Sequence, residues 1–346
     1  MKTIGYAAHS TTSALEPWTF ERRELRANDV QMQILYCGVC HSDLHQSRND
    51  WGWSSYPVVP GHEIVGVVTA VGSEVKKYKE GDRVAVGCMV DSCQHCDQCD
   101  KGEEQLCRHG NTQTYNGRDR ITGDPTYGGY SKDLVVREEF VLSLPDSLDM
   151  AKAAPLLCAG ITTWSPLRHW QAGPGKRVGI VGLGGLGHMG VKIAAAMGAE
   201  VTLISHSASK EEDAHRLGAS KFLLSSDKAA MKAASCSLDL IVNTASSLTR
   251  VDPYMRLLDF DGTMAVVGLP ENDLSVSAFT LVGQRRRLTG TNNGGVPQTQ
   301  EMLDFCGKHG LGADIELIGF DQVNEAWDRV VASDVKYRFV LDTATL

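Results

Sequence analysis

A glycine-rich turn near the middle of the chain constrains the fold more than any other stretch. It reads Val181-Gly-Leu-Gly-Gly-Leu-Gly187, follows an apolar run at 177–181 and precedes a helical run that ends at Gly198. The glycines of a G-x-G-x-x-G turn allow a tight bend, approach of the backbone to a pyrophosphate and close helix–strand packing. The β-α-β context therefore predicts dinucleotide binding, with a purely structural turn as the alternative. The expected binding positions are Gly182, Gly184, Gly185, Leu186 and Gly187.

Strand and helix patterns alternate on both sides of this turn, from 153 to 292. Such alternation predicts a parallel, doubly wound sheet, which is the architecture of a Rossmann domain. Besides the strand at 177–181, the pattern gives strands at 200–204, 238–242 and 263–267, and helices at 186–197, 210–217 and 252–259.

The first 152 residues read differently, as short apolar strands separated by glycine turns, with few amphipathic helices. They predict a β-rich domain built around a partly open barrel. After residue 293 a helix is expected between Pro297 and Gly310, followed by a strand at 334–341. We assign this tail to the first domain, although the pattern alone does not fix its return. The expected domains are 1–152 with 293–346, and 153–292.

The residues after the strand at 200–204 indicate which dinucleotide is bound. An NAD site places a carboxylate there for the ribose hydroxyls. This chain has Ser-His-Ser-Ala-Ser-Lys instead, with no acidic residue before Glu211. Hydroxyls and an ammonium group suit the 2′-phosphate of NADP(H), so we expect Ser205, Ser207 and Lys210 to bind it. An ordinary serine-rich loop with a solvated lysine is the alternative.

Four cysteines lie within fifteen residues in a C-x2-C-x2-C-x7-C array. Cys93, Cys96, Cys99 and Cys107 have the spacing of a closed, structural zinc site. A zinc ribbon for nucleic acid is the competing interpretation. It is disfavoured because acidic residues at 91, 97, 100, 103 and 104 would repel phosphate.

Composition excludes several classes of partner. The chain has 42 acidic against 34 basic residues, a net charge of −8 and no long basic run, which argues against nucleic acid and anionic membranes. We find no signal-peptide pattern and no apolar stretch of about 18 residues. Ten cysteines then favour metal binding in a reducing compartment over disulfides, so a cytoplasmic location is expected.

A second zinc ion is predicted at Cys40, His62 and Cys158. Two thiolates and one imidazole would leave one position of a tetrahedral ion open for a substrate oxygen. Spacing alone does not prove this site, and each cysteine could instead be a small buried apolar residue. The ionisable neighbours of Cys40 and His62 favour the metal-binding interpretation.

These motifs together resemble the zinc-dependent medium-chain alcohol dehydrogenases, and within them the cinnamyl alcohol dehydrogenase-like group. The resemblance covers nearly the whole chain. Besides the cysteine array and the glycine turn, it rests on Cys40-His-Ser-Asp-Leu-His45, Gly61-His-Glu-Ile-Val-Gly66, Leu157-Cys-Ala-Gly-Ile-Thr-Thr163 and Asp334-Val-Lys-Tyr-Arg-Phe339. It implies a GroES-like catalytic domain, a Rossmann domain, one catalytic and one structural zinc ion, and a homodimer joined near 275–291.

The resemblance also supplies residue roles. Ser42 would hydrogen-bond the substrate oxygen and start a proton relay to His45, while Asp43 would orient the imidazole of His62. Glu63 would lie behind the zinc ion. Thr162 would lie near the nicotinamide, and Arg338 near the cofactor phosphates.

The substrate is expected to be a small aldehyde or alcohol. Trp51 and Trp53 match pocket-lining positions and would favour aromatic or medium-chain aliphatic aldehydes, unless they are core residues. The segment Thr112-Gln-Thr-Tyr-Asn116 lacks the pocket tryptophan of plant members, which puts a lignin precursor in doubt. We therefore expect a broad-specificity aldehyde reductase. The alternatives are an NAD-preferring alcohol dehydrogenase, a zinc-free quinone reductase, or a non-catalytic protein that senses dinucleotides.

Overall fold

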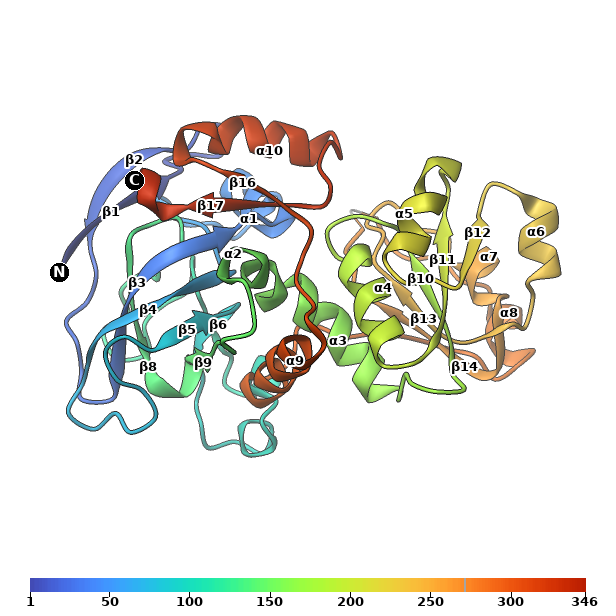
Figure 1. Ribbon diagram of the computed structural model, residues 1–346, viewed down its shortest axis with the longest axis horizontal. Helices are drawn as coiled ribbons and strands as arrows, with labels where there is room; N and C mark the ends of the chain where they lie inside the picture. The colour runs from blue at the N-terminus through green and yellow to red at the C-terminus, as the bar shows by residue number, and fades with distance from the viewer. Residues whose placement is uncertain (271) are drawn as a thin grey trace. The chain divides into compact units, whose positions relative to one another are not determined.

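The computed structural model describes residues 1–270 and 272–346 and divides them into two compact units. Unit 1 comprises Met1–Cys158 and Gly294–Leu346, and unit 2 comprises Ala159–Asn293. Figure 1 shows both units, with the start and the end of the chain in the same one. The expected boundaries at 152/153 and 292/293 fall near these divisions, and the assignment of domains remains a prediction.

Unit 1 is built on a seven-stranded sheet in the order β16-β17-β3-β4-β5-β9, with β8 also paired to β3. Neighbouring strands are antiparallel except β16 and β17. Valine and isoleucine dominate these strands because branched side chains pack well on a pleated, buried surface. The strands are β3 (Asp29–Gly38), β4 (Ile64–Val71), β5 (Arg83–Val86), β8 (Asp133–Arg137), β9 (Leu142–Ser143), β16 (Ile315–Ile318) and β17 (Arg338–Asp342).

The tail of the chain adds two of these strands. Val340 and Leu341 of β17 pair with Gly38 and Cys37 of β3, three residues before the first predicted zinc ligand. Two small antiparallel pairs and four helices complete the unit. They are β1 (Lys2–Ala7) with β2 (Glu16–Glu21), β6 (Met89–Asp91) with β7 (Thr112–Gln113), and α1 (His41–Arg48), α2 (Met150–Ala153), α9 (Val296–His309) and α10 (Val323–Val331).

Unit 2 contains a six-stranded, fully parallel sheet in the order β12-β11-β10-β13-β14-β15. Relative to its own first strand this is the order 3-2-1-4-5-6 of the Rossmann fold, so the predicted doubly wound sheet is confirmed. Its strands are β10 (Arg177–Val181), β11 (Glu200–Ser205), β12 (Lys221–Leu224), β13 (Leu238–Asn243), β14 (Leu258–Val266) and β15 (Arg287–Gly290). Its helices are α3 (Ala159–His169), α4 (Gly187–Ala196), α5 (Glu211–Arg216), α6 (Lys228–Ala233), α7 (Asp252–Met255) and α8 (Ala278–Val282).

Single 3₁₀ turns join several of these elements. They lie at Cys99–Lys101, Glu104–Leu106, Glu138–Phe140, Ala154–Leu157, Ala208–Lys210, Phe320–Gln322 and Thr343–Thr345.

Two sequence-based predictions of elements were wrong in part. The helix expected over 252–259 ends at Met255, because the residues from Leu258 onward form β14 beside β13. The strand expected from residue 334 begins only at Arg338. The expected helix ending at Gly310 is confirmed, and its C-terminal glycine adopts φ 64°.

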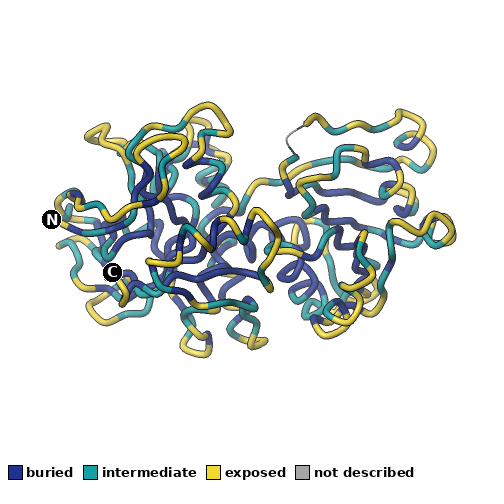
Figure 2. The backbone as a smooth tube through the Cα atoms, turned by 90° about the horizontal axis from the view of Figure 1, so that it is seen from above, coloured by how far each residue is buried: buried dark blue, intermediate teal, exposed yellow. Residues whose placement is uncertain are grey.

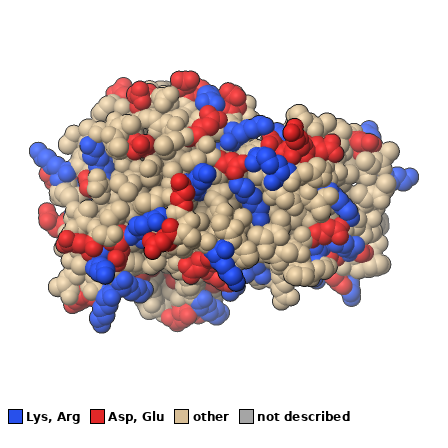
Figure 3. All heavy atoms as spheres, viewed as in Figure 1, with Lys and Arg blue, Asp and Glu red and all other residues tan. Residues whose placement is uncertain are grey.

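Each unit has its own apolar core. One core gathers β-strand residues of unit 1 around Val30, Ile34 and Ile64, and another lies around Ile204 and Ile241 of unit 2. Figure 2 shows the buried backbone concentrated inside each unit and exposed turns around it. On the face drawn in Figure 3, acidic and basic side chains are interspersed. Among the described residues, every helix is too short or too polar to cross a lipid bilayer.

Candidate metal and cofactor sites

The first group of metal donors assembles where β3 ends and β4 begins. Cys40 lies two residues after the end of β3 as the N-cap of α1, and His62 and Glu63 immediately precede β4. Since Cys37 of β3 pairs with Ile64 of β4, the strand register brings these two segments together. Cys158 comes from a different part of the chain, at the break between a 3₁₀ turn and α3.

Donor atoms of Cys40, His62, Glu63 and Cys158 all lie within 4.8 Å of one another, and all four residues are buried. The Cys40 and Cys158 sulfurs are 3.8 Å apart. Zn–S bonds of about 2.3 Å in a tetrahedral site put two thiolates about 3.8 Å apart, so the pair has the spacing that zinc requires. Oε2 of Glu63 is buried without a hydrogen-bond partner in this cluster. The donor set therefore fits a zinc ion.

Asp43 connects the donors to the surrounding backbone. Its carboxylate accepts hydrogen bonds from the Cys40 amide at 2.9 Å and the Gly61 amide at 3.0 Å, and lies 3.1 Å from Nδ1 of His62. The Tyr130 hydroxyl donates a further bond at 3.2 Å. The expected contact between Asp43 and the His62 imidazole is thus present, and Nε2 of His62 is left for a metal.

Glu63 forms a buried ion pair with Arg338. A Cβ at Gly38 would collide with the Glu63 carboxylate, so the glycine makes room for it. Burial raises the pKa of Glu63 to about 8, with Arg338 opposing that shift. Burial acts to lower the pKa of Arg338, but Glu63 and the two nearby thiols raise it overall. The expected contact of Arg338 with cofactor phosphates remains a prediction.

Electrostatics distinguish the two sulfur donors. The hydrogen bond from Cys158 holds the pKa of Cys40 well below its usual value, and His62 and Arg338 act in the same direction. The same contact raises the pKa of Cys158.

Three residues around this cluster were not predicted from the sequence as part of the site. Cys88 forms a hydrogen bond with Cys158, and this bond lowers the pKa of Cys88. The ring of Tyr115 lies 5.7 Å from that of His62, and Tyr130 bonds Asp43. No local motif marks these three positions, because each approaches the site through tertiary folding. Tyr115 lies within the Thr112–Asn116 segment, which was considered above only because it lacks a pocket tryptophan.

The relay candidates lie on α1, a helix the sequence pattern did not predict. Ser42 is partly buried in its first turn. His45 is one turn further along and contacts the Asp50 carboxylate through Nδ1 at 2.8 Å. The His45 ring also lies 5.5 Å from Trp51, which stacks on Trp53. Trp51 and Trp53 are 38% and 54% exposed, which excludes the alternative that they are core residues.

The cysteine array forms a second group, with its four sulfurs within 4.8 Å of one another. Cys93 and Cys99 are separated by 3.9 Å and Cys96 and Cys99 by 3.6 Å, close to the edges of a ZnS₄ tetrahedron. Backbone amides of Cys93 and Arg108 donate to Cys107 and Cys96 at 3.5 Å. Hydrogen bonds from the backbone amides of Cys99 and Arg108 lower the pKa of Cys96 to about 6. All four positions of a tetrahedral zinc ion would be filled by protein.

The glycine turn joins β10 to α4 at the carboxyl edge of the parallel sheet. Gly182 adopts φ 91°, and its amide donates to the Ile204 carbonyl at 2.9 Å. A Cβ at Gly187 would collide with the Gly182 carbonyl, whereas a Cβ at Gly184 would meet nothing within 4 Å. Gly187 thus permits the turn itself, and Gly184 leaves open backbone that a phosphate can approach.

The expected 2′-phosphate residues follow the neighbouring strand. Ser205 ends β11, and its hydroxyl accepts the Ser207 amide at 3.2 Å. Ser207 shares a hydrogen bond of 2.8 Å with Ser209, and Lys210 closes the same 3₁₀ turn. Thr162, on α3, donates to Asn293 at 3.2 Å.

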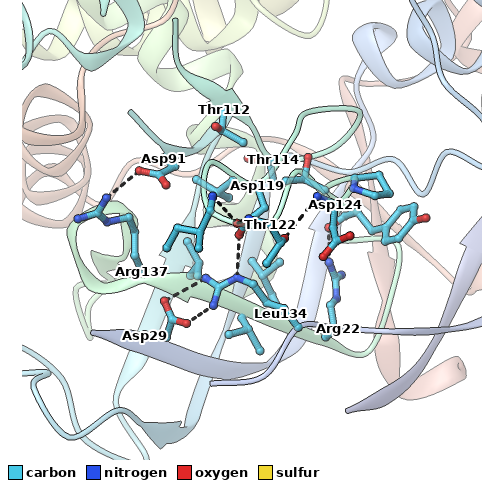
Figure 4. Close-up of a pocket in the computed structure, with 18 of the residues that line it drawn as sticks. Arg22, Asp29, Asp91, Thr112, Thr114, Asp119, Thr122, Asp124, Leu134 and Arg137 are labelled. Atoms are coloured by element: carbon cyan, nitrogen blue, oxygen red, sulfur yellow. Dashed lines mark hydrogen bonds and ion pairs between the residues drawn. The ribbon is translucent and has the colours of Figure 1, made fainter. Parts of the chain in front are cut away.

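A separate cavity of about 650 Å³ lies in unit 1 and is lined by none of the zinc donors. Figure 4 shows its charged side chains pointing toward one another. Arg26 pairs with Asp119 at 3.0 Å, and Arg137 pairs with Asp91 at 2.8 Å. Because these charges satisfy each other, the cavity offers no evident recognition of a charged ligand.

Comparison with known proteins identifies relatives along the whole chain. Residues 26–146 match the alcohol dehydrogenase GroES-like domain, and residues 185–308 match the zinc-binding dehydrogenase domain. NADP-dependent alcohol dehydrogenase C 1 of Mycolicibacterium smegmatis is 56% identical over 348 aligned positions, covering 100% of this chain and 99% of that protein. Aldehyde reductase YahK of Escherichia coli (strain K12) is 52% identical over 348 positions, with the same coverage.

Among solved structures, cinnamyl alcohol dehydrogenase SbCAD4 from Sorghum bicolor is similar with a TM-score of 0.96 and 47% identity. The match covers 99% of this chain and 98% of that one. The expected fold class, a GroES-like domain plus a Rossmann domain, is confirmed.

Proposed function

This chain belongs to the zinc-binding alcohol dehydrogenase family, and from that premise we propose that it transfers hydride between NADPH and aldehydes. Reduction to primary alcohols is the proposed working direction, and the reaction is reversible. The relatives from M. smegmatis and E. coli are named for NADP-dependent alcohol oxidation and aldehyde reduction.

One observation carries the proposal: three buried zinc donors from distant segments converge in unit 1. Cys40, His62 and Cys158 are brought together by the register of β3 and β4 and by the break before α3. Three protein ligands leave a tetrahedral zinc ion one position for a substrate oxygen. A zinc-free quinone reductase would have no need of this convergence.

When bound, zinc supplies polarisation of the aldehyde oxygen and NADPH supplies the hydride. The chain's own residues supply position and a proton. Asp43 fixes the ring orientation of His62. The Ser42 hydroxyl donates to the substrate oxygen and provides the proton that the product alcohol requires. His45 is partly exposed and held by Asp50, so it exchanges that proton with solvent.

NADP(H) is the proposed dinucleotide because no carboxylate ends β11. Ser205, Ser207 and Lys210 are the proposed contacts of the 2′-phosphate, and an acid at the position of Ser205 would have repelled it. An NAD-preferring enzyme would need an acidic residue at the end of β11, and this chain has none at that position.

The proposed substrates are aromatic and medium-chain aliphatic aldehydes. The stacked rings of Trp51 and Trp53 beside His45 offer an apolar surface near the relay. Because they select by apolar contact rather than by hydrogen bonds, broad specificity is expected.

We also propose a homodimer joined through the edge of the parallel sheet. β15 is the last strand on one side of that sheet, and α8 precedes it. Phe279 and Val282 of α8 are 86% and 69% exposed, an apolar surface that a second copy would cover. None of the ten cysteines forms a disulfide, which supports the proposed cytoplasmic location.

Steady-state kinetics with a panel of aldehydes and both reduced cofactors tests the proposal. Charge-assisted hydrogen bonds are worth about 1.5–3 kcal/mol, so kcat/KM should be about tenfold or more higher with NADPH. Metal analysis should give about two zinc ions per chain. Equal or better use of NADH would reject the NADP assignment, and failure of zinc-replete protein to reduce any aldehyde would reject the activity.

A further inference from the structure

A third group of metal donors lies at the edge of the cysteine array. Cys93 Sγ and one ring nitrogen from each of His95 and His109 lie within 4.8 Å of one another. Cys93 also belongs to the array, whereas the two imidazoles belong to neither proposed zinc site. The array and this third group therefore share one sulfur.

The two histidines occupy equivalent places in the sequence. Each lies two residues after a cysteine of the array, in Cys93-Gln-His95 and Cys107-Arg-His109. Gln94 adopts φ 62°, which turns the chain so that Nδ1 of His95 contacts the Cys93 carbonyl. The two rings then lie 5.7 Å apart between centroids and 31° from coplanar.

Exposure distinguishes the two histidines from the four cysteines of the array, of which Cys93 and Cys99 are partly buried and Cys96 and Cys107 are buried. His95 and His109 are exposed and Cys93 is partly buried, whereas Cys96 and Cys107 are each 8% exposed. Cys93 is the array cysteine that is both partly exposed and grouped with the two exposed imidazoles, so an ion in solution can reach the array there.

We propose that Cys93, His95 and His109 form a transit site through which zinc enters and leaves the four-cysteine site. The inference rests on the proposed function only in that the array holds zinc. Imidazole and thiolate are both favourable zinc ligands. A tetrahedral ion held by Cys93, two imidazoles and one water keeps its bond to Cys93 throughout. It exchanges the water and the two imidazoles, one ligand at a time, for the thiolates of Cys96, Cys99 and Cys107, and each of these thiols releases its proton to solvent.

A closed site needs such a path because it has no free coordination position. Without side chains nearby that bind zinc first, an incoming zinc ion would have to take a thiolate from the bound ion while its other ligands were all water. A purely local role accounts for His95 through its contact with Cys93, but it leaves the approach of His109 to the same thiol unexplained.

Exchange of zinc-67 into the intact protein, followed by native mass spectrometry, tests the transit site. The variant carries His95→Gln and His109→Gln, which keep polar side chains but remove both imidazoles. We expect it to retain two zinc ions per chain while the array exchanges about tenfold more slowly, the scale on which neighbouring groups tune metal sites. The two zinc ions should exchange in separate kinetic phases, and the phase that is lost in a Cys40→Ser variant belongs to the catalytic site. The rate of that phase should be the same in the wild type and in the His95/His109 variant.

Two controls separate ligand chemistry from structural damage. A double variant with His169→Gln and His309→Gln removes two exposed imidazoles that are not part of the array and should exchange at the wild-type rate. His109→Asp alone should retain fast exchange, because a carboxylate also binds zinc.

Equal array exchange in the wild type and the His95/His109 variant would overturn the transit site alone. Slow exchange in His109→Asp would overturn it as well, because a ligand role then fails to explain the effect. A wild-type protein with a single zinc ion per chain would overturn the assignment of zinc to the array, and the transit site with it.

Discussion

Asp43 connects more of the metal cluster than any of the donors themselves. Its buried carboxylate contacts four groups: the Cys40 amide, the Gly61 amide, the His62 ring and the Tyr130 hydroxyl. Cys40 and His62 are proposed zinc ligands, and Gly61 directly precedes His62. The geometry of the site therefore depends on Asp43, which is not itself a proposed zinc ligand.

Asp43→Asn should weaken zinc binding at the catalytic site by about 10–100-fold. The amide retains one acceptor oxygen but presents a donor to groups that are themselves donors. Competition with a chromophoric chelator measures the affinity. Asp50→Asn is the control, because Asp50 contacts His45 and not the donors. Unchanged catalytic zinc affinity in Asp43→Asn would contradict the role given to Asp43.

Ser42→Ala should lower kcat for aldehyde reduction by about 100-fold or more, the scale of a lost proton donor. Zinc content and NADPH affinity should remain those of the wild type, since Ser42 is not a metal donor. Ser47→Ala on the same helix is the matched control, because that buried hydroxyl has no hydrogen-bond partner. Near-normal turnover in Ser42→Ala would remove Ser42 from the relay.

At the scale of elements, the site depends on where helices and strands end. β3 stops at Gly38 and α1 starts at His41, so Cys40 lies in the N-cap position with its amide bound by Asp43. Cys158 likewise falls at a break between a 3₁₀ turn and α3. Side chains at the ends of strands and helices do not have to pack on the face of a sheet or helix, so they can point toward a shared metal ion.

The glycine turn of unit 2 permits a matched comparison. Gly187→Ala should lower the free energy of unfolding by about 1–3 kcal/mol, because its Cβ would collide with the Gly182 carbonyl. Gly184→Ala has open space and should keep wild-type stability. Denaturant unfolding of the cofactor-free variants measures both.

Both variants should nevertheless bind NADPH more weakly, because each changes the backbone that faces the pyrophosphate. Fluorescence titration measures this affinity. If Gly184→Ala bound NADPH as tightly as the wild type, the approach of a phosphate to this turn would be refuted.

At the scale of the whole molecule, the two units divide the chemistry. All seven proposed zinc ligands lie in unit 1, and the glycine turn and the serine loop lie in unit 2. The exposed apolar surface of α8 also belongs to unit 2. The proposed assembly therefore joins the nucleotide-binding units and leaves the metal donors within one chain.

Phe279→Asp should convert the proposed dimer to a monomer, because it places a charge in an apolar interface. Light scattering after size-exclusion chromatography measures the mass. Ile121→Asp replaces a residue of unit 1 that is 74% exposed and should leave the mass unchanged. A Phe279→Asp variant that keeps the dimer mass would exclude α8 from the interface.

The sequence alone determined the features that depend on local spacing. Cys93, Cys96 and Cys99 are separated by two residues each and Cys107 by seven more, so the array was predictable from spacing alone. The glycine turn was predictable because Gly182 and Gly187 meet local steric needs and Gly184 leaves the backbone open to a phosphate. The parallel sheet followed from the alternation of strand and helix.

Tertiary structure decided what depends on contacts between distant segments. Periodicity did not reveal α1, whose first turn is organised by Asp43, and it extended the helix at 252–259 into residues that pair with β13. The contact of Tyr130 with Asp43 and the ion pair of Glu63 with Arg338 span 87 and 275 residues. Such contacts leave no local pattern, because only strand pairing brings their partners together.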